Sequence, residues 1–70
     1  MITYIYGPPG SGKTQHAETL RTKYRCLRII DEWPSSVTTE TLRHGDLVLG
    51  QRLEDAPKHS RVITIMQALS

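Results

Sequence analysis

The chain has 70 residues, of which 37% are hydrophobic, and it carries a formal net charge of +2. This length favours one domain and excludes a multidomain enzyme. So small a net charge, without any run of consecutive Lys or Arg, gives no indication of a nucleic-acid-binding protein.

Cysteine usage and apolar patterning bear on where the chain is expected to work. Cys26 is its only cysteine, so an intrachain disulfide is excluded and a reducing compartment is favoured. No apolar stretch approaches the roughly 18 residues of a membrane span. The N-terminal residues also lack the basic region and apolar run of a signal peptide. We therefore expect a soluble, cytoplasmic protein with no membrane association.

The N-terminal part of the chain predicts a strand, a sharp turn and a helix. Residues 2–6 are β-branched or aromatic, which is typical of a strand, and they end abruptly at Gly-Pro-Pro-Gly in residues 7–10. From Lys13 to about Tyr24, apolar residues recur at helical spacing, at Ala17, Leu20 and Tyr24. We expect a helix there with one buried stripe.

Residues 26–30 (Cys-Leu-Arg-Ile-Ile) predict a second strand, closed by Asp31-Glu32 and stopped by Pro34. A short helix is expected to begin at Ser35-Ser36 and reach Arg43, with Gly45 as its C-terminal stop. Residues 46–50 predict a third strand, residues 51–60 a polar loop, and residues 62–66 a fourth strand.

Most of these strands are nearly continuous apolar runs, which favours a mostly parallel sheet covered by helices. The order of the elements predicts an α/β fold in one minimal domain over residues 1–70, with a four-stranded sheet, one long helix and one short helix. Because the last connection is short, we expect the fourth strand to be antiparallel or at an edge.

The residues after the first strand carry the strongest chemical signal. Residues 7–14 read Gly-Pro-Pro-Gly-Ser-Gly-Lys-Thr and match the pattern G-x-x-x-x-G-K-[ST] in full. At average residue frequencies, a chain this short would match it by chance at roughly the 0.2% level. A strand precedes the match and a helical pattern follows it, which is the context that this motif requires.

Each part of this motif has a physical role in binding phosphate. Glycines let successive backbone N–H groups converge on one anion, and the start of the following helix adds positive potential. Lys13 supplies a cation to the β- and γ-phosphates, and Thr14 supplies a hydroxyl to Mg²⁺. The sequence predicts nucleotide binding by Gly7, Pro8, Pro9, Gly10, Ser11, Gly12, Lys13 and Thr14.

The motif resembles the Walker A sequence of AAA+ and related ASCE-like ATPases, and the chain is loosely similar to a group of very small P-loop proteins encoded in bacteriophage genomes. The first resemblance covers eight residues. It implies a P-loop NTPase with ATP and Mg²⁺ as cofactors, and the second implies the host cytoplasm as the location.

Residues 27–32 (Leu-Arg-Ile-Ile-Asp-Glu) resemble a Walker B strand in which Arg28 is a polar intruder. The resemblance implies that Asp31 holds the Mg²⁺ shell and that Glu32 orients or activates the attacking water. Walker B usually follows Walker A after an intervening strand and helix, whereas only one helix separates them here. Either that strand has been deleted, or the acid lies next to the first strand, as in a kinase-like order.

Three downstream residues are further candidates. Gln51 follows the third strand where AAA+-like proteins carry a polar sensor residue, although Asn, Thr or Ser is usual there; a solvated residue at the start of a loop is the equal alternative. Arg52 and Arg61 lie where such ATPases often carry an arginine finger, although each taken singly fits a surface arginine better. The predicted catalytic residues are thus Lys13, Glu32 and Gln51.

Three functions fit these residues. The first is an ATP-binding protein with slow, Mg²⁺-dependent ATPase activity. The second is a non-catalytic, nucleotide-dependent interaction module that modulates a partner or host machine. The third, a small nucleotide kinase, is less favoured because few residues remain for a second-substrate pocket and lid. The guanine-specific Asn-Lys-x-Asp pattern is absent, which favours ATP over GTP. We expect self-association or a larger protein partner to supply what so short a chain lacks.

Overall fold

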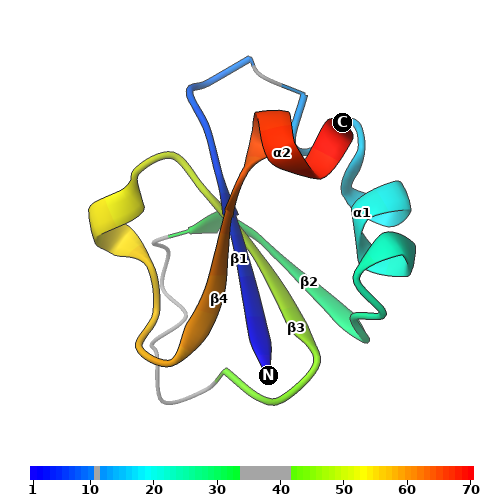
Figure 1. Ribbon diagram of the computed structural model, residues 1–70, viewed down its shortest axis with the longest axis vertical. Coiled ribbons are helices and arrows are strands. Elements are labelled where there is room, and N and C mark those ends of the chain that lie inside the picture. Colours follow the sequence, from blue (N-terminus) through cyan, green and yellow to red (C-terminus); the bar gives the residue numbers. More distant parts are fainter. Residues whose placement is uncertain (11, 34–41) are drawn as a thin grey trace.

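The computed structural model describes residues 1–10, 12–33 and 42–70, with Glu32 described for its backbone only. Four strands form one sheet in the order β2-β3-β1-β4, and every pair is parallel. The elements in chain order are β1 (Ile2–Tyr6), α1 (Ala17–Lys23), β2 (Arg28–Trp33), β3 (Asp46–Gly50), the short 3₁₀ helix η2 (Leu53–Asp55), β4 (Ser60–Thr64) and α2 (Ile65–Leu69). The predicted α/β class and four-stranded sheet are confirmed (Figure 1).

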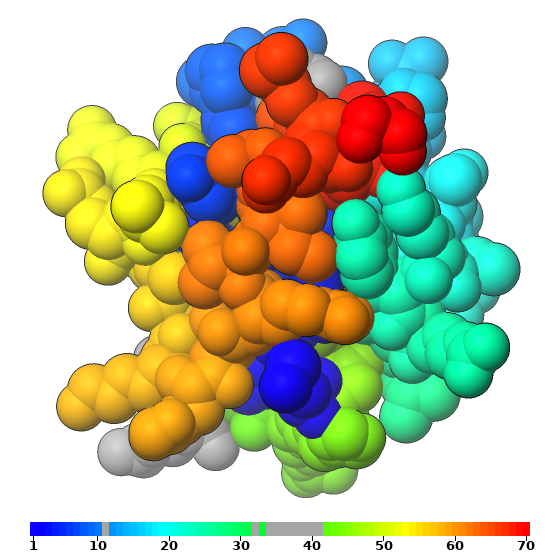
Figure 2. All heavy atoms as spheres, in the orientation of Figure 1, coloured from blue at the N-terminus to red at the C-terminus, as the bar shows by residue number. Residues whose placement is uncertain are grey.

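The sheet has an apolar cluster on each face, because side chains alternate along a strand. On one face, Ile5, Leu47 and Leu49 pack against Leu20 of α1 and Ile65 of α2. In Figure 2 the orange edge strand β4, which pairs with β1, and the red α2 face the viewer. On the other face, the fully buried Tyr4 and Val48 form a cluster with buried Trp33 and Leu42 and with half-buried Ala56 of the 51–59 connection.

The two crossover connections that meet at the centre of the sheet run in opposite directions. The chain leaves β1 through α1 and reaches β2, on one side of β1; it leaves β3 through η2 and reaches β4, on the other side. Right-handed crossovers in opposite directions cover opposite faces of a sheet. The ends of β1 and β3, which pair directly, therefore diverge, and such a point is where parallel sheets form ligand crevices.

Two predicted elements near the N-terminus have different bounds in the structure. The helix begins at Ala17 and not at Lys13. The backbone N–H of Ala17 bonds to the carbonyl of Thr14 at 3.3 Å, which gives a turn in place of a helical i to i−4 bond. The second strand continues through Asp31-Glu32 to Trp33, so the acidic pair lies within β2 and does not close it.

The C-terminal elements also depart from expectation. β4 begins at Ser60 and ends at Thr64; Ile65 and Met66, predicted as strand, belong to a second short helix. A capping box explains the change, because the Thr64 hydroxyl accepts from the backbone of Gln67, whose side chain accepts from the backbone N–H of Thr64. β4 is an edge strand, as one alternative proposed, and it is parallel.

The short helix predicted up to Arg43 lies mostly outside the described residues, and Leu42 and Arg43 are not helical. Within the described residues, neither helix has the length and apolar character needed to cross a lipid bilayer.

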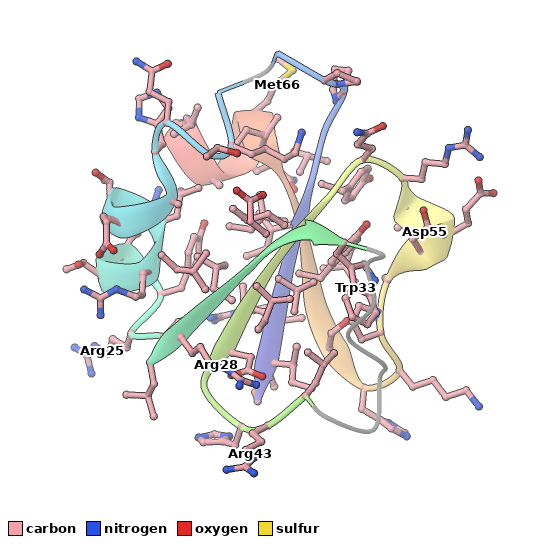
Figure 3. All side chains as sticks on the ribbon, turned by 180° about the vertical axis from the view of Figure 1, so that it is seen from behind. Arg25, Arg28, Trp33, Arg43, Asp55 and Met66 are labelled. Atoms are coloured by element: carbon pink, nitrogen blue, oxygen red, sulfur yellow. The ribbon has the colours of Figure 1, made fainter. Side chains whose placement is uncertain are left out.

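An ion pair between half-exposed Arg28 and buried Asp46 lies at the opposite edge of the sheet from the C-terminal ends of β1 and β3. The Asp46 carboxylate accepts hydrogen bonds from Arg28 Nε at 3.0 Å, from Arg28 Nη2 at 2.6 Å and from the backbone N–H of Arg43 at 2.8 Å. Arg28 and Arg43 lie close together at this edge (Figure 3). Burial raises the pKa of Asp46, but the hydrogen bonds from Arg28 and Arg43 outweigh it, so the pKa lies below its ordinary value of 3.8.

The lowered pKa of Asp46 predicts that the stability of the fold decreases at acidic pH. A depressed folded-state pKa adds stability above pH 3.8, and that stability is lost as the pH falls through the folded-state value. We expect Asp46→Asn to lower the free energy of unfolding at pH 7, and the difference from wild type to shrink below about pH 4. Urea unfolding of both proteins between pH 2 and 7 measures this. A difference that is constant over the whole range contradicts the assignment.

Candidate functional site

Residues 7–14, called the 7–14 loop below, leave the C-terminal end of β1 beside the end of β3. The backbone N–H of Gly7 donates to the carbonyl of Gly50 at 3.2 Å, which extends the pairing of these strands by one step. Gly10 and Gly12 have φ angles of 79° and 92°, a region that side chains disfavour. Both glycines are therefore needed for the path of this loop.

Lys13 folds back over the loop. Its Nζ donates to the carbonyl oxygens of Gly7 at 2.8 Å and Pro8 at 3.0 Å. These bonds hold a positive charge above the loop backbone. The ammonium group therefore lies next to any anion that binds in the loop.

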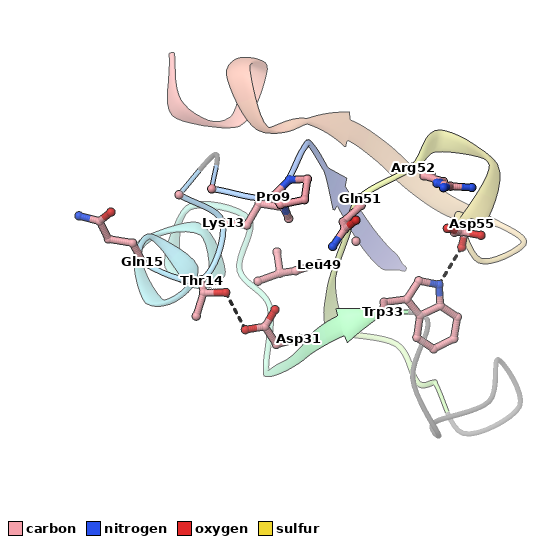
Figure 4. A pocket seen from close by; sticks show the side chains of 13 residues that line it. Pro9, Lys13, Thr14, Gln15, Asp31, Trp33, Leu49, Gln51, Arg52 and Asp55 are labelled. Atoms are coloured by element: carbon pink, nitrogen blue, oxygen red, sulfur yellow. Dashed lines mark hydrogen bonds between the residues drawn. The ribbon is translucent and has the colours of Figure 1, made fainter.

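Thr14 and Asp31 meet across the site, although 17 positions separate them in the chain. Thr14 Oγ1 donates to Asp31 Oδ2 at 2.9 Å, and Figure 4 shows the two side chains facing each other. A hydroxyl and a carboxylate oxygen are ligands that Mg²⁺ accepts. The structure thus brings together the two residues that the sequence predicts as metal ligands.

A bulge in β2 places the acidic pair. Ile30 pairs with Val48 and Trp33 pairs with Gly50, so β2 contains one residue more than β3 between these two pairs. In a regular strand Ile30 and Trp33 would point to opposite faces, yet both pack in the cluster around Tyr4. Bulges re-aim side chains and occur often beside active sites. Here the bulge coincides with Asp31-Glu32.

A cleft of about 690 Å³ opens over the C-terminal ends of the central strands. One side is the 7–14 loop with the start of the following turn, and the opposite side comes from β2 and from the residues after β3 (Figure 4). The lining includes five residues predicted at the phosphate site, together with the sensor candidate Gln51 and the finger candidate Arg52; the five are Pro9, Gly10, Gly12, Lys13 and Thr14. Asp31 lines it as well.

Residues 50–55, called the wall segment below, form the side of the cleft opposite the loop. Two aromatic side chains hold it by hydrogen bonds to backbone carbonyls: Tyr4 donates its hydroxyl to Arg52 at 2.7 Å, and Trp33 donates Nε1 to Asp55 at 2.7 Å. Burial raises the pKa of the Tyr4 phenol above its ordinary value of 10.0, and the nearby Asp55 carboxylate adds to this. The phenol therefore remains protonated and a donor.

Some predicted residues lie elsewhere. Arg61 lies on β4, where its Nη2 donates to Thr3 Oγ1 at 3.1 Å and its guanidinium covers the Tyr24 ring at 5.0 Å; it does not line the cleft, so the structure does not support it as a finger. Gly7 and Pro8 support Lys13 and do not line the cleft. Ser11 and the side chain of Glu32 lie outside the described part of the chain.

Several residues of the site, among them Trp33, Asp55 and Tyr4, were not in the set of site residues predicted from sequence. Trp33 and Asp55 line the cleft, and Tyr4 supports the wall from beneath. Trp33 follows the acidic pair directly, and the sequence favours a packing role for it over stacking on a base; it packs in the cluster around Tyr4 and also lines the cleft. Nothing near Tyr4 or Asp55 in the sequence indicates their roles, because each acts on residues distant along the chain.

The strand order bears on the spacing of the two motifs. β2 pairs with β3, and β3 lies between β2 and β1. The alternative in which the acidic strand lies beside the first strand is therefore wrong.

Comparisons of the chain with protein-family models, with curated proteins and with solved structures found no match.

Proposed function

We propose that this chain binds Mg-ATP in the cleft between the 7–14 loop and the wall segment and hydrolyses it slowly. The observation that carries the proposal is the contact between Thr14 and Asp31 at 2.9 Å, beside Lys13 and the positive-φ glycines. The Walker-type motif requires these groups to act together, and they come from separate elements of the chain.

The loop supplies the charge and the hydrogen-bond donors for phosphate. Its glycines leave the backbone N–H groups open to an anion. Lys13 exchanges its two carbonyl partners for phosphate oxygens, and charge-assisted hydrogen bonds of this kind are about twice as strong as neutral ones. Regular helix begins only at Ala17, so Lys13 and the loop backbone carry more of this binding than a helix dipole does.

Thr14 and Asp31 are the residues that would hold Mg²⁺. Within the described residues, no group of three or more His, Cys, Asp or Glu side chains gathers as a metal site. Two oxygen ligands suit Mg²⁺ that arrives with a nucleotide, because this ion usually takes one or two protein ligands and completes its shell with phosphates and water. When bound, Mg²⁺ neutralises charge on the β- and γ-phosphates.

Hydrolysis is the attack of water on the γ-phosphorus, which breaks the bond to the bridging oxygen and releases ADP and phosphate. Glu32 directs the water and takes its proton, a role assigned from its position after Asp31 in the sequence. Gln51 lines the cleft opposite the loop side that carries Lys13 (Figure 4). From there it would hydrogen-bond to the terminal phosphate or to the water. Gln51 and Arg52 are both exposed on the wall segment, so the site excludes water poorly and turnover is slow.

The proposal is tested by calorimetric titration of the wild-type chain with ATP, in excess Mg²⁺ and in EDTA. We expect saturable binding that is tighter with Mg²⁺. Phosphate release is then measured for wild type and Glu32→Gln, with unfolding curves as a folding control. Slow release that Glu32→Gln abolishes while binding persists supports the ATPase. Binding with equal, background release in both proteins supports the binding-only interaction module. A chain that binds no nucleotide excludes both functions.

A further inference from the structure

A buried tyrosine connects the strand that carries the 7–14 loop to the opposite side of the cleft. Tyr4 lies on β1, which continues directly into the loop. Its side chain is fully buried at 0% exposure, and its hydroxyl reaches Arg52 across 48 positions of sequence. One rigid side chain thus connects the middle of β1, three residues before the loop begins, to the backbone of the wall segment.

The ring of Tyr4 fits closely between its neighbours. A Cβ atom at Gly50 would lie 2.7 Å from Cε1 of this ring, a distance that real Cβ atoms do not show, so only glycine fits at the start of the wall segment. The ring of Tyr6 also stacks against Tyr4, with centroids 6.1 Å apart. The Tyr4 hydroxyl therefore has little freedom to leave Arg52.

The wall segment depends on such anchors because its own side chains contribute little burial. Gln51, Arg52, Leu53 and Glu54 are all exposed, and Leu53 is 57% exposed. The two side-chain anchors are Tyr4 at Arg52 and Trp33 at Asp55, and Figure 3 shows Trp33 and Asp55 side by side. The anchor from Tyr4 is the nearer one along the chain to Gln51.

The two sides of the cleft offer different groups to a bound triphosphate. Lys13 and the glycines line the loop side and would hold the β-phosphate, whereas Gln51 and Arg52 line the other side and would meet the terminal phosphate. A diphosphate can use the loop side alone. Contacts from the wall segment therefore distinguish a triphosphate from a diphosphate, provided that the wall segment stands at the right distance from the loop.

We propose that Tyr4 is a positioning residue that holds the wall segment at the distance needed to contact the γ-phosphate, and so sets the preference of this site for ATP over ADP. This inference rests on the proposed nucleotide-binding function. Tyr4 does not itself touch the nucleotide. It acts through its hydrogen bond to Arg52, which fixes the backbone that carries Gln51 and Arg52.

The test compares Mg-ATP and Mg-ADP affinities of wild type, Tyr4→Phe and Tyr6→Phe by calorimetric titration. Phenylalanine keeps the buried ring and removes only the hydroxyl. We expect Tyr4→Phe to lower the preference for ATP over ADP by about threefold to tenfold, the range of one hydrogen bond, with ADP affinity unchanged. Tyr6→Phe is the matched control, because Tyr6 makes no hydrogen bond to the described wall residues, and its ATP to ADP ratio should equal that of wild type.

Each outcome decides the inference. An unchanged ratio in Tyr4→Phe overturns it, as does an equal loss of ATP and ADP affinity, which indicates a merely structural role. A wild-type chain that binds ATP and ADP equally also overturns it and leaves nucleotide binding intact. A wild-type chain that binds neither nucleotide overturns the proposed function as well. If Tyr4→Phe does not fold, the fluorescence of Trp33, the single tryptophan, decides: Mg-ATP must change it more than Mg-ADP, and equal changes overturn the inference.

Discussion

Replacement of Lys13 by alanine is expected to weaken Mg-ATP binding by about tenfold to a hundredfold. A hydrogen bond to a charged group contributes about 1.5–3 kcal/mol, and about 1.4 kcal/mol corresponds to a factor of ten in affinity. Lys13 is the cation that the 7–14 loop holds beside its own backbone, through the carbonyls of Gly7 and Pro8. Its loss removes this charge from the loop side of the cleft. Titration of the variant with Mg-ATP measures the effect.

Lys58→Ala is the matched control for this experiment. Lys58 is an exposed lysine in the turn before β4, and it does not line the cleft. Both variants lower the net charge by one, so a loss of affinity shared by both reflects the overall charge and contradicts a local role for Lys13. Because Lys13 also bonds to the loop backbone, the unfolding curve of Lys13→Ala should accompany the titration, to show that the variant is folded.

The second large effect is expected at Leu20, which anchors α1 to the sheet. Leu20 is fully buried at 0% exposure, in the cluster with Ile5 and Leu49. Leu→Ala in a core costs about 2–5 kcal/mol, whereas a domain of this length has a total stability of about 4–10 kcal/mol at about 0.05–0.15 kcal/mol per residue. We expect Leu20→Ala to lose a large part of its stability, as measured by urea unfolding, and to bind Mg-ATP more weakly at temperatures where it is partly unfolded.

Leu27→Ala provides a control with the same chemical change. Leu27 is 76% exposed, just before β2. Surface substitutions usually change stability by no more than about 0.5 kcal/mol, so Leu27→Ala should unfold close to wild type. If both variants lose the same free energy of unfolding, Leu20 does not contribute to stability as a buried core residue.

The parts of the site that were predicted correctly are those encoded by adjacent residues. The 7–14 loop is one contiguous segment, and its glycines, lysine and threonine lie together because the chain itself keeps them together. The strands over residues 2–6 and 46–50 were also predicted at their observed bounds. Asp31 was placed beside Thr14 by analogy with the Walker motifs, and the contact between them is present.

The errors lie where long-range contacts or a local cap decided the structure. β2 continues past Ile30 because its bulge lets Trp33 pair with Gly50 and pack beside Tyr4. The missed helix α2 had a readable signal in the pair Thr64 and Gln67, but the apolar run from Val62 to Met66 favoured a strand. Arg61, a predicted arginine-finger candidate, contacts Thr3 and Tyr24 instead of the cleft. It lies on β4, which is on the other side of β1 from β3.

The sequence by itself determined the α/β class and the glycine-rich loop with its lysine and threonine, and it singled out the acidic residue that faces this loop, because each is encoded in a short, contiguous pattern. Only the tertiary structure decided that the strands are all parallel, that β3 separates β1 from β2, and that Tyr4 and Trp33 hold the wall segment opposite the loop. These features depend on which strands pair and on which face each connection crosses. Hydrogen bonds between residues as distant as Tyr4 and Arg52 have no local signature, so they appear only once the chain is folded.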